Sequence, residues 1–102
     1  MITISDEILQ EFKDRLHISH ASEDENLKRL LSFSIADLTA KCGDFDLATN
    51  EKAKELVFER TRYAYNDALE FFDDNFLSLI TSLGISIALQ DVVLEVDESE
   101  TV

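Results

Sequence analysis

The hydrophobic positions of this chain recur at helical spacing from close to the N-terminus. Ser5 is a fair start signal, because a serine hydroxyl can cap the free N–H groups of a first helical turn. Two acidic residues come directly after it, which the positive end of the helix dipole favours. The apolar residues that come next lie one to four positions apart: Ile8, Leu9, Phe12 and Leu16. This spacing predicts a first helix over about residues 5–16.

A second helix is predicted after the stretch HISHASEDENL, where the apolar pattern lapses. Ser22 and Glu25 have the spacing of a capping box, in which the serine caps a first-turn N–H group and the glutamate reaches back. The apolar face of this helix consists of Leu27, Leu30, Leu31, Ser34, Ile35, Leu38 and Cys42. Gly43 then stands where a left-handed C-terminal cap is expected.

The next predicted helix is the longest of the chain. GDFDLATN has the residues of a loop, and Thr49 or Asn50 can cap a helix that begins after it. From about residue 50 to residue 73 no glycine or proline interrupts the pattern. Two neighbouring apolar stripes result, one of Ala53, Val57, Ala64, Ala68 and Phe71 and one of Phe58, Thr61, Tyr65, Leu69 and Phe72. Because this face is wider than the roughly 100° that a surface helix buries, the helix is either central or keeps one flank for a partner.

The C-terminal part of the pattern is less definite. Phe76, Leu77, Ile80 and Leu83 continue at helical spacing up to Gly84, which indicates a short last helix or a bent extension. The segment ISIALQDVVLEV fits both a strand and a helix, although a single short strand has no obvious mate. Residues 95–102 are expected to form a flexible acidic tail. The predicted fold is all-α: one domain over residues 1–94, a small bundle of three to four helices around the long central helix 50–73.

Composition and charge narrow the function classes. The chain has 102 residues, which is enough for one domain, and its two glycines and lack of proline favour helices. The net charge of -13 argues against binding to a nucleic-acid backbone, which basic patches normally anchor. All nine Lys and Arg lie at or before Arg62, and the residues after it carry acids only. This asymmetry serves solubility, or a neighbouring chain supplies the missing positive charge.

The sequence predicts a soluble chain made in the cytoplasm. No apolar run approaches the roughly 20 residues of a membrane-spanning helix, and the N-terminus lacks the features of a signal peptide. We therefore expect no membrane partner. Cys42 stands alone, so no internal disulfide is possible, and an inert thiol is its expected role.

Known motifs for catalysis and metal binding are lacking from the sequence. His17 and His20 provide two of the three or four ligands that zinc requires. Glu70, Asp73 and Asp74 do not have the spacing of a calcium loop. A nucleophile elbow, a phosphate-binding glycine loop and a zinc-protease motif are also missing. The sequence therefore predicts no catalytic residue, no metal, no cofactor and no enzymatic activity.

Three residues of the long helix remain of interest as contacts. Arg60 falls at the edge of the apolar stripe, where its head can reach Asp67 two turns on or an acid of another chain. Tyr63 and Tyr65 fall on opposite flanks, so at least one ring is expected near the surface. Arg62 and Tyr63 are expected to project from the polar flank.

The chain as a whole resembles a known family. The segments FKDRLHI, SEDENLKRLL and ELVFERTRYAYNDALEFFDDNFLSLITSLGI, in this order, resemble the small head-tail connector proteins of tailed bacteriophages and prophages, which are also called head completion or adaptor proteins. The likeness spans nearly the whole chain. It is strongest from Glu55 to Ile85.

The resemblance implies a structural virion protein at the head-tail interface, present in the host cytoplasm before assembly. Such a protein is a monomer in isolation and assembles as a twelve-fold ring under the portal protein after DNA packaging. There it extends the DNA channel and provides a platform for the stopper, the next connector protein. An acidic channel wall repels DNA, which suits a conduit through which the genome slides without specific binding.

Interface residues are chosen from expected exposure and charge, because the family has no catalytic residues to carry over. They are Arg60, Arg62 and Tyr63 on the long helix, and Ile85, Ile87, Val92 and Val93 in the segment after it. The charge of -13 also allows an alternative, an acidic regulatory or DNA-mimic protein that binds a basic host partner.

Overall fold

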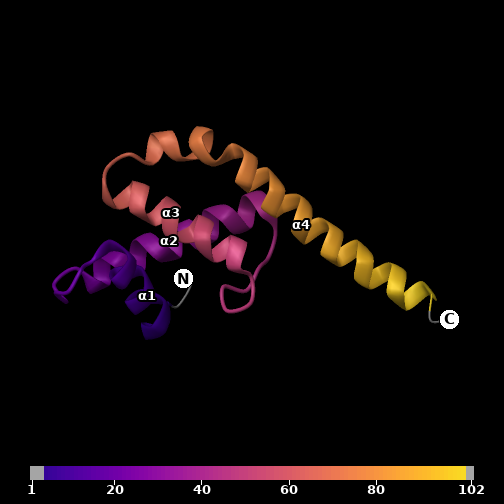
Figure 1. Ribbon diagram of the computed structural model, residues 1–102, viewed down its shortest axis with the longest axis horizontal. Coiled ribbons are helices and arrows are strands. Elements are labelled where there is room, and N and C mark those ends of the chain that lie inside the picture. Colours follow the sequence, from indigo (N-terminus) through magenta and orange to yellow (C-terminus); the bar gives the residue numbers. More distant parts are fainter. Residues whose placement is uncertain (1–3, 101–102) are drawn as a thin grey trace.

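The computed structural model describes residues 4–100, with side chains described up to Gln90. The helices are α1 (Asp6–Leu16), α2 (Asp24–Cys42), α3 (Glu51–Tyr65), the 3-10 helix η1 (Leu69–Phe71) and α4 (Phe72–Glu100), and residues 4–100 contain no strand. The predicted all-α fold is confirmed. Figure 1 shows α1, α2 and α3 forming the body, while α4 crosses over it and then projects beyond it. The molecule is accordingly elongated, with extents of 56 × 29 × 22 Å.

The helix starts agree with two of the three predicted caps. The Ser5 hydroxyl accepts a hydrogen bond from the Ile8 N–H at 3.2 Å, and the Asn50 side chain accepts one from the Ala53 N–H at 3.0 Å. The capping box at Ser22 is wrong, because α2 begins at Asp24 and the residue before it makes no side-chain cap. The Ser22 hydroxyl instead pairs with Nδ1 of His20 at 2.9 Å.

The predicted long helix over residues 50–73 is also wrong, since α3 ends at Tyr65. Asp67 has a φ of +57°, in the left-handed region. The Ala68 N–H donates to the Tyr63 carbonyl at 2.8 Å and the Asp67 N–H donates to the Ala64 carbonyl at 3.2 Å, which is the pattern of a Schellman motif. Aspartate tolerates this conformation because its short polar side chain can bond locally. A helix stop therefore forms here without glycine.

The chain reverses after this stop and continues as α4, which passes through Gly84 without interruption. A glycine inside a helix costs only about 1 kcal/mol, which the packing of the surrounding residues outweighs. The ambiguous segment from Ile85 onward is helical up to Glu100, so the expected domain boundary at residue 94 falls inside α4. The expected flexibility of the tail in solution stays a prediction, and residues 101–102 lie outside the described part of the chain.

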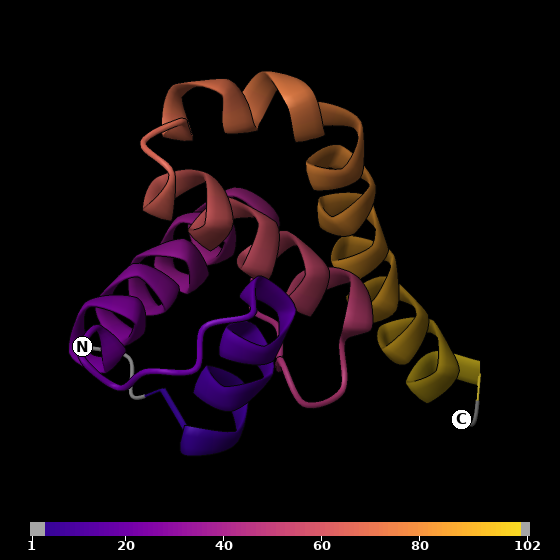
Figure 2. The ribbon, with the colours of Figure 1, turned by 60° about the vertical axis from the view of Figure 1, so that its left-hand side comes forward.

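One core lies between the helices, and α4 contributes residues such as Phe72, Ile80 and Leu83 to it. Figure 2 shows α4 lying along one side of the body. The side chains that are fully buried include Phe12, Leu27, Leu31, Leu38, Val57, Phe58, Phe72 and Leu83. Gly43, at the end of α2, has a φ of +103°, and a Cβ there would lie 3.1 Å from Cγ2 of Ile87 on α4. The backbone conformation therefore favours glycine here, and a larger residue would also require the Ile87 side chain to shift.

An aromatic cluster joins α4 to α3 directly after the reversal. The rings of Phe72 and Phe76 stack at 5.0 Å between centroids. The Tyr63 ring meets both edge-on, at 5.8 Å from Phe72 and 5.5 Å from Phe76. Geometries of this kind stabilise a contact by about 0.5–1.5 kcal/mol per pair beyond the burial of area. We refer to Tyr63, Phe72 and Phe76 as the aromatic joint.

The adjacent residues Phe71 and Phe72 give a matched test of this joint. Phe72 is completely buried, whereas Phe71 is 56% exposed. We expect Phe72→Ala to lower the free energy of unfolding by about 3–5 kcal/mol, the usual cost of removing a buried aromatic side chain. We expect Phe71→Ala to cost less than about 1 kcal/mol. Urea unfolding followed by circular dichroism measures both, and equal costs would contradict the arrangement of the joint.

A second test concerns the contact between α3 and the start of α2. The Tyr65 hydroxyl donates to the Glu23 carboxylate at 2.6 Å, and this hydrogen bond raises the pKa of Tyr65. The stabilisation from the bond is therefore present below pH 10, the ordinary pKa of tyrosine, and is lost as the pH rises through the higher pKa of the folded chain.

In a Tyr63→Phe background, the ultraviolet titration of tyrosine reports Tyr65 alone, since the chain has two tyrosines. We expect Glu23→Ala to lower the midpoint of this titration. Identical curves with and without Glu23 would show that the bond does not form.

Candidate interaction surface

The side of α4 that faces away from the core is apolar and exposed. Residues 76–90 carry no charge at all. Leu77, Ile85 and Leu89 are 60%, 55% and 56% exposed, and each is a large hydrophobic residue. They share one side of the helix with the exposed residues Thr81 and Ala88, because positions 77, 81, 85 and 89 recur every fourth residue and position 88 comes three residues after 85. We call these five residues the outer face of α4.

The sequence predicted no segment long and apolar enough to span a membrane, but the region of η1 and α4 contains one by these criteria. The segment Leu69–Gln90 is long and apolar enough to cross a membrane by these two criteria, and 22% of its most apolar window is buried. The buried share belongs to the side that packs on the body, through residues such as Phe72, Ile80 and Leu83. A helix that is apolar on both sides normally has partners on both, and within residues 4–90 only one side has them.

The interface residues expected on this segment separate into three groups. Ile85 lies on the outer face of α4, as expected for a contact residue. Ile87 is 8% exposed and belongs to the core, where it meets Gly43, so its expected exposure is wrong. The backbone of Val92 and Val93 belongs to α4, but their side chains lie outside the described residues.

Arg60 is not on an exposed flank. Its Nε donates to the Asp37 carboxylate at 3.0 Å and its Nη1 donates to the Ser34 hydroxyl at 3.2 Å. The buried Thr61 hydroxyl is hydrogen-bonded to the Ser34 hydroxyl at 2.9 Å. With 15% of its side chain exposed, Arg60 bridges α3 to α2. The expected contact with Asp67 does not form, because Asp67 lies beyond the end of α3.

Of the two residues expected to project from this flank, Arg62 is accessible, whereas Tyr63 packs against the core. Arg62 is bonded to Glu59 one turn earlier at 2.6 Å, and 41% of its side chain is exposed. Its guanidinium lies 5.4 Å from the centroid of the Tyr63 ring. Tyr63 is partly buried in the aromatic joint, and its hydroxyl accepts a hydrogen bond from the Asn75 side chain at 3.1 Å. The tyrosine therefore serves the fold, and Arg62 covers its ring.

Most of the positive charge of this chain is used internally. Seven of the nine basic residues form ion pairs with acids of the same chain: Lys13, Arg15, Lys28, Lys41, Lys54, Arg60 and Arg62. Arg15 holds Glu55 with two hydrogen bonds at 2.9 and 2.6 Å, and these bonds lower the pKa of that carboxyl. The basic N-terminal part is therefore not a free positive surface.

A groove runs between α3 and α4, beside the aromatic joint. Its volume is about 470 Å³, and it is lined by Glu51, Lys52, Glu55, Leu56, Glu59, Phe76 and Leu79. The three glutamates recur every fourth residue along α3 and therefore share one side of that helix. The apolar residues come from α3 and α4, and Leu79 is 48% exposed. We call this feature the α3–α4 groove. Three glutamates outnumber the one base of the lining, Lys52, which donates to the Ser82 hydroxyl at 3.2 Å. The groove therefore suits a segment that carries both an apolar and a basic side chain.

The residues weighed for metal binding or redox chemistry have structural roles. His17 adopts the left-handed conformation, with a φ of 59°, at the end of α1. Among the described residues, no three His, Cys, Asp or Glu side chains are grouped so that they could hold a metal ion. Burial raises the pKa of the Cys42 thiol, which donates to the Ile80 carbonyl at 3.4 Å. These side chains connect elements of the fold.

Comparison of this chain with protein-family models, with curated proteins and with solved structures finds no significant match. A role for the protein must therefore be inferred from its own surfaces. Ile85 was the one residue of the outer face of α4 that the sequence marked as a contact, and the α3–α4 groove was not expected. A signal for the outer face was present, because the absence of charge from residue 76 to residue 90 is visible in the sequence. The groove depends on the reversal at Asp67, which the helical pattern did not indicate.

The two arginines of α3 provide a test of these contacts. We expect Arg60→Met to lower the free energy of unfolding by about 1–2 kcal/mol, because the bonds to Asp37 and Ser34 are lost. We expect Arg62→Met, a change of the same size on the same helix, to cost less than about 0.5 kcal/mol, as is usual for an exposed pair one turn apart. Urea unfolding of both variants measures the difference. Equal effects would mean that Arg60 does not bridge α2 and α3.

Proposed function

We propose that this protein is a structural adaptor of a tailed bacteriophage or prophage, which assembles as a ring under the portal protein and provides the platform for the stopper. The observation that carries the proposal is the exposed, uncharged outer face of α4, which lies largely within the segment Glu55–Ile85 that resembles the head-tail connector family. The proposed role is structural and needs no catalytic residue and no cofactor.

The outer face of α4 favours assembly on energetic grounds. Leu77, Ile85 and Leu89 are each more than half exposed. Burial of the rest of each side chain contributes about 1 kcal/mol, since full burial contributes about 1.5–3 kcal/mol. A single contact of this size does not overcome the entropy that association costs. A ring on a preformed portal repeats the contact at every subunit, so that assembly can depend on the portal.

The shape and charge of the molecule support the same proposal. Figure 1 shows α4 extending past the body, where neighbouring subunits and the portal can reach it. The net charge of -13 disfavours adhesion to the DNA backbone, so a ring of such subunits lets the genome pass without specific binding. In this proposal the protein is in the host cytoplasm before assembly and at the head-tail interface of the virion afterwards.

The test is to mix the purified protein with portal rings from the same genome and to image the product by electron microscopy. We expect an added protein layer with the rotational symmetry of the portal. Leu77→Asp and Ile85→Asp are each expected to prevent the layer, because both place a charge in the apolar contact. Ser86→Asp is the matched control: it adds the same charge next to Ile85, at an exposed position beside the outer face, and should leave the layer intact.

Failure of the wild-type protein to bind the portal of its own genome would contradict the proposal. Salt-sensitive capture of a basic host protein without portal binding would favour the acidic regulator instead. Binding to lipid vesicles without portal binding would assign the outer face of α4 to a membrane surface. In each case the same two aspartate variants show whether the outer face of α4 makes the contact.

A further inference from the structure

The exposed side of α2 has a distinctive composition. Its exposed residues Asn26, Arg29, Phe33, Ala36 and Ala40 alternate three and four positions apart and so form one stripe along the helix. We call this stripe the outer face of α2. Phe33 is 53% exposed and is the one aromatic residue on it. Two alanines come after it on the same stripe, so the ring projects from an otherwise low surface, in the manner of a knob.

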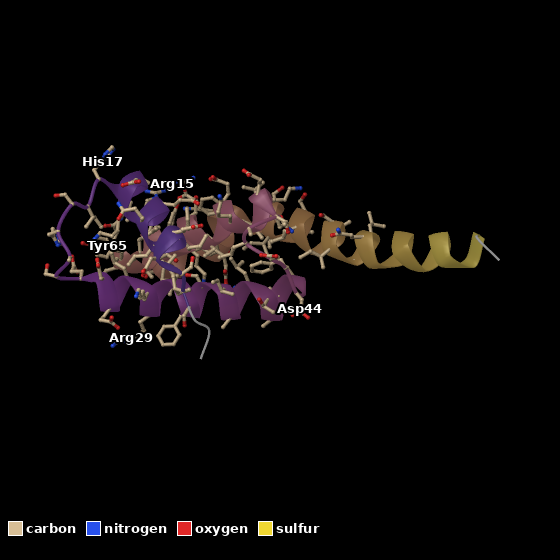
Figure 3. All side chains as sticks on the ribbon, turned by 90° about the horizontal axis from the view of Figure 1, so that it is seen from below. Arg15, His17, Arg29, Asp44 and Tyr65 are labelled. Carbon is tan, nitrogen blue, oxygen red and sulfur yellow. The ribbon has the colours of Figure 1, made fainter. Side chains whose placement is uncertain are left out.

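Arg29 stands one turn before Phe33 on this stripe. Among the described side chains it is the one base with neither an ion pair nor a side-chain hydrogen bond to another residue of the chain. Figure 3 shows its side chain pointing away from the body at the lower edge of the view. The outer face of α2 thus presents one apolar knob and one available positive charge.

The α3–α4 groove has the complementary features. Its apolar floor of Leu56, Phe76 and Leu79 lies in a volume of about 470 Å³, which is large enough for an aromatic ring. Of the three glutamates on its rim, Glu55 is bonded to Arg15 and Glu59 to Arg62. Glu51 has no ion pair among the described residues. Glu51 is therefore available to pair with a basic residue of a segment whose apolar side chain enters the groove.

The two surfaces lie on opposite sides of the molecule. Arg15, which is bonded to Glu55 of the groove, lies at the upper edge of Figure 3, whereas Arg29 lies at the lower edge. Phe33 of one chain therefore cannot reach the groove of the same chain, but it can reach the groove of a second copy. Because the two surfaces differ, the contact is head-to-tail and leaves one of each surface available for further copies.

We propose that the α3–α4 groove binds the outer face of α2 of a second copy of this chain, with Phe33 in the groove and Arg29 facing Glu51. This proposal rests on the proposed function, because it describes how neighbouring subunits of the ring contact one another. The outer face of α4 then remains for the portal or for a third element. The ion pair directs the orientation of the two copies, and the aromatic ring supplies most of the buried area.

A charge exchange tests the pairing of Arg29 with Glu51. Arg29→Glu and Glu51→Arg each place like charges together and should weaken self-association by at least about tenfold. An equimolar mixture of the two variants should restore it, because each contact in the mixed assembly again joins opposite charges. Sedimentation equilibrium over a concentration series measures the association. Lys28→Glu is the matched control, since Lys28 is next to Arg29 but faces Asp6 of α1 at 3.6 Å.

Cross-linking tests the position of Phe33. In the double variant Phe33→Cys, Leu79→Cys, oxidation should link successive copies into dimers, trimers and longer ladders. Each single variant can give dimers at most, because the native Cys42 is buried. Phe33→Cys combined with Ser78→Cys is the control, because residue 78 is exposed and does not line the groove. The ladder should form faster with Cys at position 79 than at position 78.

Both tests are made on the isolated chain and again on layers bound to the portal. The second setting tests the contact even if the isolated chain is a monomer. If the protein binds the portal but neither the charge exchange nor the cross-linking pair has an effect, the contact is overturned and the adaptor proposal stands. Restored association without portal binding supports the contact and removes the adaptor proposal. Equal ladders at positions 78 and 79, or no ladder in either setting, overturn the contact.

Discussion

The fold of this protein depends on the aromatic joint of Tyr63, Phe72 and Phe76. The chain reverses at Asp67, and the joint then holds the first turns of α4 against the last turn of α3. Beside these rings, the start of α4 is held by the ion pair of Asp73 with Lys41 of α2 at 2.7 Å, while the neighbouring residues Leu69 and Phe71 are exposed. The joint sets the path of α4 across α2, and Ile87 secures that path at Gly43. Phe76 of the joint also lines the α3–α4 groove, so one ring both stabilises the fold and contributes to a surface for binding.

The path of α4 leaves the chain with more apolar surface than it can bury. A helix of 29 residues reaches about 43 Å at 1.5 Å per residue, and only one side of its first half meets the body. Covering the other side within this chain would require a further helix. In the proposed adaptor ring, the portal or a third element supplies that cover. The internal ion pairs have a related effect: because seven bases already pair with acids of the same chain, the proposed contacts between copies use apolar surfaces and few charges.

The helical pattern of the sequence predicts the class of fold and most of the core. Ser5 and Asn50 act as caps as expected, and the apolar face of α2 is largely buried, because these features depend on residues close together in the chain. The stop at Asp67 was missed because aspartate only tolerates the left-handed conformation, whereas glycine at the same place would have marked it. At Gly84 the sequence suggested the end of a helix, but α4 continues through this glycine. Ile87 and Arg60 were placed on the surface for a related reason, since their partners, Gly43 and Asp37, come from distant parts of the chain.

The central claim is that assembly covers the outer face of α4. Hydrogen–deuterium exchange of residues 76–90, measured on the isolated chain and on the chain bound to portal rings, tests this most directly. In the isolated chain these amides should exchange faster than those of α2 and α3, because few tertiary contacts hold this part of the helix closed. In the bound state their exchange should slow markedly. Unchanged exchange over residues 76–90 in a complex that has formed would contradict the claim, because the face would then be as exposed after assembly as before it.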